Sequence, residues 1–216
     1  PSADNKQALD ELREELDVDE MRADVRDLTQ GIREGVLRST EIIRTLKNFS
    51  RADRSEEAER VNVHEGLESV LLILQHKVKH GDIKLTKDYA TDLPKIECFS
   101  GMLNQVFMNI IANATQAFNE EQKDRQVLIK TKPVEDGKQI EIIIRDNGKG
   151  IPEDIKARIF EPFFTTKPKN VGTGLGLAIS RDIIDKHNGT INVYSEPGEG
   201  TEFVITLPVV RVNAET

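Results

Sequence analysis

Residues 104–118 read NQVFMNIIANATQAF, and this stretch decides how we expect the chain to fold. No charged residue occurs between Cys98 and Asn119, although charged residues make up 31% of the chain. Apolar side chains recur here at the spacing of one helical face: Leu103, Val106, Phe107, Ile110, Ala114 and Ala117. This periodicity predicts a helix over residues 101–119 that packs against a core.

The opposite face of this predicted helix carries neutral amides instead of the usual lysines and glutamates. They are Gln105, Asn109, Asn113 and Gln116. Asparagine is a poor helix former, so a row of amides suggests an enclosed polar surface. Amide oxygens suit a hard cation such as Mg²⁺, which takes phosphate oxygens and water as further ligands. The alternative is that the amides bond neighbouring loops, and the stretch alone leaves both interpretations open.

On both sides of this helix the chain alternates helical and strand-like patterns. Further helices are predicted over residues 64–80 and 174–187, with a short one near 152–160. Strands are predicted over residues 83–90, 95–99, 126–133, 139–146, 190–196 and 200–208. Asp136-Gly137 and the segment PGEG at 197–200 are hairpin signals. We therefore expect an α+β fold, a two-layer sandwich of a mixed β-sheet and three main helices.

The segment RDNGKGIP, residues 145–152, follows a strand that looks buried. Asn-Gly is the commonest hairpin turn, but no strand follows it, and Pro152 begins a helical stretch instead. The glycines therefore allow a close approach of the backbone, beside Asp146. A carboxylate there can accept a hydrogen bond from an exocyclic amine such as that of adenine.

The segment GTGLGL, residues 172–177, opens an apolar helix. Glycine-rich turns at a helix N-terminus favour anions, because free backbone N–H groups and the helix dipole face outward. The segment is not a P-loop, because no GxxxxGK[ST] pattern occurs in the sequence. It is not a dinucleotide fingerprint either, because Leu177 stands where a third glycine is needed and no strand leads into it. Alone, the pattern is weak.

Between these two segments lies EPFFTTK, residues 161–167. Core packing is the simplest interpretation of Phe160, Phe163 and Phe164. The polar PKNVG that follows has the composition of a mobile lid. Lys167 could then reach a phosphate, although a lone lysine in a loop is usually only solvated.

Residues 1–60 contain no strand-like run. Apolar or small residues follow a 4-3 spacing from Met21: Val25, Leu28, Ile32, Gly35, Ser39, Ile42, Leu46 and Phe49. This heptad seam predicts a long bundle helix that needs partners to bury its stripe. The alternative is a solvated helix held by salt bridges.

The bulk composition excludes several classes of protein. A net charge of −8 argues against general binding of nucleic acid. No run reaches the roughly 18 apolar residues of a membrane span, and the acidic N-terminus is unlike a signal peptide. The single cysteine, Cys98, excludes an internal disulfide and fits a buried position in a reducing, cytoplasmic setting.

The order and spacing of the motifs resemble the ATP-binding domain of bacterial sensor histidine kinases, in the superfamily that also contains gyrase, Hsp90 and MutL. NQVFMNIIANATQAF resembles the N box, RDNGKGIP the first glycine box, FEPFFTTK the F box and NVGTGLGLAIS the second glycine box. The resemblance covers about residues 61–208. In addition, STEIIRTLKNFSR, residues 39–51, resembles the second helix of the family's dimerisation bundle.

The resemblance implies a role for each matching residue. Asn113 would bind Mg²⁺ with Asn109 beside it, and Asp146 would accept from the adenine amine. Ile151 would line the base pocket with Gly148 and Gly150. The remaining residues expected at the ATP site are Gln116, Lys167 in the lid, Gly172, Thr173, Gly174, Leu175, Gly176, Leu177 and Thr201.

The implied architecture is a helical dimerisation segment over residues 1–60 and an ATP-binding catalytic domain over 61–216. The implied activity is transfer of the γ-phosphate of Mg-ATP to a histidine, then to an aspartate of a response-regulator receiver domain. No histidine precedes His64. We therefore assign no phosphoacceptor in this chain and expect it on a bundle helix of a longer protein or of a partner. The alternatives are a non-catalytic dimerising regulator and a related ATPase or serine kinase.

His64 stands beside Glu65 in VNVHEGL, residues 61–67. The pair looks reactive, but it lies after the long helix and no proline follows it, unlike an acceptor box of the family. We expect Asn62 or Val63 to lead into a helix whose first turn carries Glu65, a favourable charge at that end.

Overall fold

The computed structural model describes residues 58–167 and 172–210, together with separate positions between Met21 and Val36. The contacts divide the chain into two units, Pro1–Ser50 and Arg51–Thr216. In the first unit, the described positions are helical, and Met21, Val25 and Leu28 are exposed. Most of the predicted seam, including Gly35 and Ser39, lies outside the described residues. The dimerisation bundle therefore stays a prediction.

The second unit is built on a five-stranded sheet with the order β2-β4-β5-β7-β6. The strands are β2 (Ile83–Asp88), β4 (Arg125–Val134), β5 (Gln139–Asp146), β6 (Thr190–Glu196) and β7 (Gly200–Pro208). The β2 and β4 strands are parallel and the other pairs are antiparallel. In this register Asp146, the last residue of β5, stands opposite Thr201 at the start of β7.

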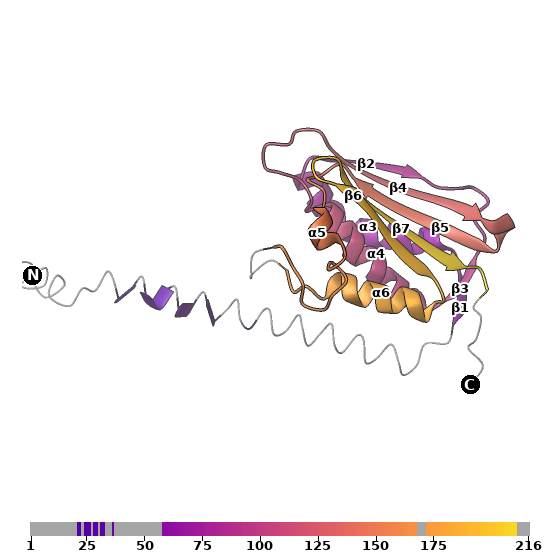
Figure 1. Ribbon diagram of the computed structural model, residues 1–216, viewed down its shortest axis with the longest axis horizontal. Coiled ribbons are helices and arrows are strands. Elements are labelled where there is room, and N and C mark those ends of the chain that lie inside the picture. The colour runs from indigo at the N-terminus through magenta and orange to yellow at the C-terminus, as the bar shows by residue number, and fades with distance from the viewer. Residues whose placement is uncertain are drawn as a thin grey trace, which may run out of the picture. The chain divides into compact units, whose positions relative to one another are not determined.

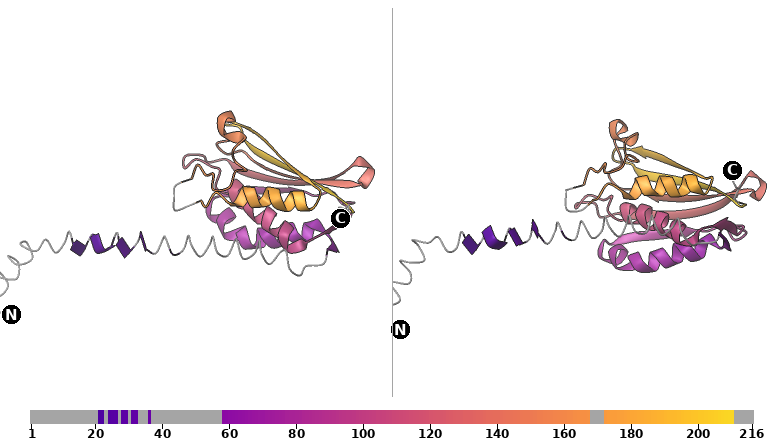
Figure 2. Two further views of the ribbon diagram at one scale, coloured as in Figure 1. Left: turned by 60° about the horizontal axis from the view of Figure 1, so that its bottom comes forward. Right: turned by 90° about the horizontal axis from the view of Figure 1, so that it is seen from below.

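Three helices form the second layer: α3 (Val63–His80), α4 (Ser100–Ala114) and α6 (Gly176–Lys186). Figures 1 and 2 show all three on one face of the sheet. Alternate residues of β4, β5 and β7 are buried beneath them, as the period-two pattern of a half-covered sheet requires. The predicted two-layer α+β sandwich is confirmed. No helix of the described residues is both long and apolar enough to cross a membrane.

The structure adds one strand that the sequence pattern did not predict. Strand β1 (Glu59–Val61) pairs antiparallel with β3 (Ile96–Cys98). We expected no strand within residues 1–60, and this expectation is wrong for Glu59 and Arg60. Three residues are too few to show an alternating pattern, and pairing with β3 supplies the missing information. Cys98 is fully buried as predicted, and this burial raises the pKa of its thiol to about 12.

The predicted helix 101–119 is too long, because α4 ends at Ala114. The chain then turns, and the Ala117 carbonyl accepts a hydrogen bond from the Lys149 N–H at 2.9 Å. The turn after Ala114 places this carbonyl against the loop after β5. The apolar periodicity continues to Ala117, three residues beyond the end of the helix.

His64 has a structural role in the first turn of α3. Asn62 caps the helix by accepting from the His64 N–H at 3.0 Å. The His64 ring stacks on Tyr89 with centroids 4.5 Å apart, and its Nε2 forms a 2.9 Å hydrogen bond with Thr131 Oγ1. These contacts join α3 to the segment after β2 and to β4.

We expect His64→Ala to leave nucleotide affinity unchanged while lowering the free energy of unfolding by about 1–2 kcal/mol. The reason is the loss of one hydrogen bond and one ring contact. Urea unfolding and a nucleotide titration of the same sample measure both quantities. A loss of nucleotide binding in a folded variant would contradict this assignment.

Candidate nucleotide site

The residues expected at an ATP site gather at one end of the two layers. In Figure 1 the C-terminal ends of α4 and β5 and the N-terminal ends of α6 and β7 all face the loop that carries α5 (Glu153–Lys156). Residues far apart in the sequence therefore meet at one edge of the sandwich. Residues 168–171, within the predicted lid, lie outside the described part of the chain.

Asp146 is a buried carboxylate at the end of β5. Only 4% of its surface is exposed, and one oxygen accepts from the Gly148 N–H at 2.9 Å. Burial raises the pKa of Asp146 to about 6, although backbone hydrogen bonds from Gly148 and Thr201 oppose the shift. A carboxylate with so little water around it accepts strongly from any donor that reaches it.

The glycines after Asp146 are required by contacts within the protein. A Cβ at Gly148 would lie 2.5 Å from the Ala117 carbonyl oxygen. A Cβ at Gly150 would lie 2.0 Å from the Glu196 carbonyl oxygen, and the φ of Gly150 is +71°. The expected close approach of the backbone is thus present, and it is made to the loops after α4 and β6.

Sequence reasoning missed Ser195, whose hydroxyl joins three parts of this edge. It accepts from the Ile151 N–H at 2.8 Å and donates to the Gly200 carbonyl at 2.7 Å. The Thr201 hydroxyl lies 3.0 Å away. Ser195 thereby connects the first glycine segment to the start of β7. The one feature of the sequence that could have pointed to Ser195 is its position two residues before the predicted turn PGEG.

The second glycine segment leads into α6 as predicted. Gly174 has a φ of +70°, and a Cβ there would lie 2.4 Å from the Phe163 backbone. Thr173 is partly exposed, Leu175 is buried, and Leu177 is partly exposed in the first turn. The N-terminus of α6 has no side-chain cap. Its first N–H groups are the kind that an anion satisfies.

The amides of α4 divide into two groups. Asn109 donates through Nδ2 to the Gly176 carbonyl at 2.9 Å and to the Ser180 hydroxyl at 3.2 Å. It therefore holds α4 against α6. The alternative interpretation had the amides bond neighbouring loops, and for Asn109 the neighbour is a helix. Asn113 and Gln116 instead present their oxygens to the Lys167 ammonium, at 2.8 and 2.7 Å. We predicted that Lys167 reaches a phosphate. In this structure its ammonium instead contacts the amide oxygens that we predicted to lie near a metal.

Of the three phenylalanines predicted to pack in a core, Phe163 is exposed, and Phe160 and Phe164 are partly buried. Phe163 is 67% exposed and has a φ of 66°. The guanidinium of Arg181 lies 5.5 Å from the centroid of Phe160, and that of Arg158 lies 4.5 Å from the centroid of Phe164. The core interpretation is therefore wrong for Phe163. The backbone of Phe163, in this left-handed conformation, is the part of the chain that lies against Gly174.

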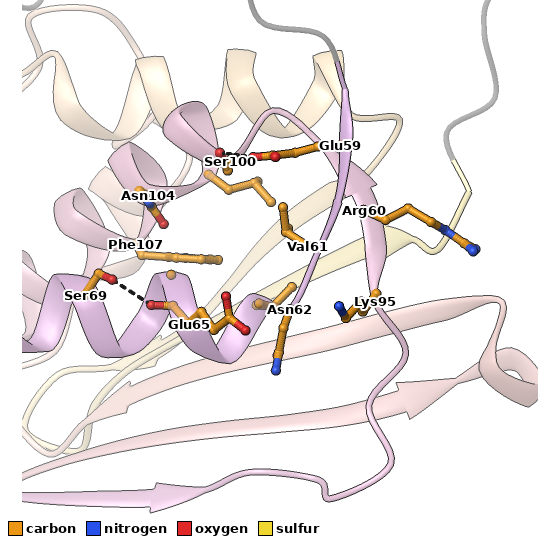
Figure 3. A pocket seen from close by; sticks show the side chains of 13 residues that line it. Glu59, Arg60, Val61, Asn62, Glu65, Ser69, Lys95, Ser100, Asn104 and Phe107 are labelled. Atoms are coloured by element: carbon orange, nitrogen blue, oxygen red, sulfur yellow. Dashed lines mark hydrogen bonds between the residues drawn. The ribbon is translucent and has the colours of Figure 1, made fainter.

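A cavity of about 340 Å³ lies between β1 and the first turns of α3 and α4. Figure 3 shows Glu65, Lys95, Asn104 and Phe107 among the side chains around it. A Cβ at Gly66 would lie 2.4 Å from Asn104 Oδ1, so glycine permits this packing of α3 on α4. None of the residues expected at the ATP site lines this cavity, so the two sites are separate.

Comparison with known proteins places the chain in a family. Residues 100–211 match the family model described as histidine kinase-, DNA gyrase B-, and HSP90-like ATPase. The signal transduction histidine-protein kinase AtoS of Escherichia coli (strain K12) is 38% identical over 168 residues, covering 78% of this chain and 26% of AtoS.

Solved structures share the fold. The catalytic domain of histidine kinase ThkA superimposes with a TM-score of 0.63 at 29% identity, covering 72% of this chain and 98% of that one. ThkA in complex with the response regulator TrrA gives a TM-score of 0.59 at 24% identity, covering 79% of this chain and 49% of that one. The chain therefore belongs to the histidine kinase-, DNA gyrase B-, and HSP90-like ATPase family, and its described domain is a histidine-kinase-type ATP-binding domain.

Proposed function

We propose that this domain binds Mg-ATP at the edge formed by α4, β5, α6 and β7. The observation that carries the proposal is the buried Asp146 carboxylate, which faces the loop end of the sheet beside Gly148 and Thr201. It would accept from the adenine amine, with Gly150, Ile151 and Thr201 around the base. The uncapped N-terminus of α6, in GTGLGL, would receive the phosphates.

The described residues fit a metal that arrives with the nucleotide. The oxygens of Asn113 and Gln116 already face a positive charge, that of Lys167. No cluster of three histidine, cysteine or acidic side chains suited to a metal exists among the described residues. Because Mg²⁺ prefers carboxylate, phosphate and water oxygens, a site with few protein ligands depends on phosphate to complete it. In our proposal Asn113 holds Mg²⁺, which neutralises phosphate charge in the bound state.

We further propose that the bound ATP donates its γ-phosphoryl group to a histidine outside this chain. The bond from the γ-phosphorus to the β–γ bridging oxygen breaks, a bond to the histidine nitrogen forms, and ADP leaves. The chain spans about a quarter of the length of AtoS, so the activity of the whole protein is inferred. ThkA forms a complex with the response regulator TrrA, which supports a receiver domain as the next phosphate acceptor.

The remaining parts of the proposal concern organisation. Residues 1–60 would form a dimerising helical segment and residues 61–216 the catalytic domain, in a cytoplasmic setting. The relatives' names favour a kinase over a non-catalytic regulator or a serine kinase.

A transfer assay tests this proposal directly. The full chain is mixed with labelled ATP, Mg²⁺ and a separate bundle segment that carries a histidine in an acceptor box. We expect acid-labile phosphate on the segment, and none when Asp146→Asn replaces the wild type. ATP binding without transfer would support the regulator, and acid-stable phosphate would support serine chemistry.

The raised pKa of Asp146 predicts that adenine binding depends on pH. With a pKa of about 6 in the free protein, the accepting carboxylate is present above pH 6 and is lost as the pH falls below it. Adenosine affinity should therefore fall about tenfold between pH 7 and pH 5. An NMR titration with adenosine, which lacks titrating phosphates, measures this dependence. The same profile in Glu141→Gln serves as a control, and equal affinities at both pH values would exclude Asp146 as the acceptor.

A further inference from the structure

Lys167 is held by two neutral oxygens and by no carboxylate. Its Nζ donates to Asn113 Oδ1 at 2.8 Å and to Gln116 Oε1 at 2.7 Å. No ion pair between described residues includes Lys167. The ammonium therefore bridges two side chains that lie nearly one turn apart at the end of α4, and it keeps both amide oxygens on the same side.

Among the described residues, the contacts of Lys167 hold its ammonium without neutralising its charge. Amide dipoles compensate an ammonium less fully than a carboxylate does. A contact of this kind can be broken by a ligand that offers Lys167 a negative charge, such as a phosphate.

Lys167 and a metal ion would compete for the same oxygen. Mg²⁺ binds oxygen at about 2.1 Å, so a metal on Asn113 Oδ1 would lie within a few ångströms of Nζ. Two cations at that separation repel each other, because few water molecules fit between them to screen the repulsion. In the absence of phosphate, each therefore weakens the binding of the other.

We propose that the Lys167 ammonium occupies the metal-binding oxygens in the nucleotide-free protein. When nucleotide binds, Mg²⁺ replaces the ammonium on these oxygens. This inference rests on the proposed function, because it takes Asn113 as the metal ligand. Lys167 keeps Asn113 and Gln116 oriented and prevents the binding of a metal without nucleotide. Once displaced, its ammonium is free to face the phosphates.

The test uses the full chain and Mn²⁺ alone, as a paramagnetic substitute for Mg²⁺, and follows the side-chain NH₂ signals of Asn113 and Gln116 by NMR. In the nucleotide-free wild type, broadening should require high Mn²⁺ concentrations. In Lys167→Met the midpoint should fall roughly tenfold, the value of one lost charged hydrogen bond. Lys167→Arg keeps the charge and should behave as the wild type.

Lys149→Met is the matched control, because it removes a neighbouring positive charge without touching the amides. Equal midpoints in the wild type and Lys167→Met, or an equal shift in Lys149→Met, would overturn the exchange. A separate titration of the wild type with Mn²⁺ and ATP tests the metal assignment itself. If Asn113 broadens there while Lys167→Met gains nothing without ATP, only the exchange fails. If Asn113 stays sharp with ATP, the metal assignment of the proposed function fails.

Discussion

Asparagine at position 146 is expected to weaken ATP binding by about a hundredfold. The carboxylate of Asp146 is buried, and one oxygen already accepts from the Gly148 N–H. In Asp146→Asn the amide oxygen can keep that bond, but its NH₂ group would then meet the adenine amine, donor against donor. The loss of a charged hydrogen bond and the unmet donors cost about 3 kcal/mol together. Calorimetric titration with Mg-ATP measures the change.

The same substitution should stabilise the nucleotide-free protein, which separates loss of binding from loss of folding. The pKa of Asp146 is about 6 in the folded protein and 3.8 as its ordinary value. The folded state therefore disfavours the ionised form, at a cost that is absent below pH 4 and complete above pH 6. A neutral asparagine removes this cost, which is about 3 kcal/mol at pH 7. Its NH₂ group cannot accept a hydrogen bond, and the loss of one backbone partner, Gly148 or Thr201, reduces the net gain by about 1–2 kcal/mol. Urea unfolding at pH 7 and pH 4 checks the sign.

Glu141→Gln is a suitable control, because Glu141 lies on the same strand and pairs with Lys132 at 2.7 Å, away from the site. It should change ATP affinity little. A folded Asp146→Asn variant with wild-type affinity would remove Asp146 from the site and with it the placement of the base.

Gly200→Ala is expected to have a large effect on folding. Gly200 has a φ of +101°, and a Cβ there would lie 2.0 Å from the Asp146 carbonyl oxygen. Neither backbone can move away easily, because β5 and β7 pair along their whole length. We expect Gly200→Ala to lower the free energy of unfolding by about 4 kcal/mol or more.

Gly198→Ala provides a matched comparison from the same turn. Gly198 has a φ of +85°, but nothing lies within 4 Å of its Cβ position. Only the backbone strain remains, which costs about 1–2 kcal/mol. Urea unfolding of the two variants side by side separates strain from collision. Equal losses would show that the collision with Asp146 is relieved at no cost.

The sequence was informative where one segment determines its own structure. The long helices and the hairpin strands follow from periodicity and turn residues, and the segments with boxes like those of the family lie at one edge as expected. The end of α4 at Ala114 did not follow from the periodicity, which continues to Ala117. Beyond Ala114 the chain contacts a distant loop, through the hydrogen bond from the Lys149 N–H to the Ala117 carbonyl. Strand β1 exists only through its pairing with β3.

The site shows the same division between local and distant causes. The spacing in the sequence marks Asn113 as a candidate ligand, but cannot show that Lys167 lies on its oxygen. Ser195 forms hydrogen bonds with three residues on other segments, and no sequence pattern around it predicts these contacts. The sequence also cannot show that Phe163 is exposed or that its backbone lies against Gly174, because only the folded chain brings these residues together.

The pairing of Asp146 with Thr201 in neighbouring strands has a mechanical consequence. On the proposed assignment, the base end of the nucleotide lies at two central strands that are paired with each other by backbone hydrogen bonds. The phosphate end meets a helix terminus and a lysine that can be displaced. The base side of the site would then be fixed, while the contacts on the phosphate side could rearrange. Such a site can exchange its contacts with the phosphates before and after transfer, while its contacts with the base stay the same.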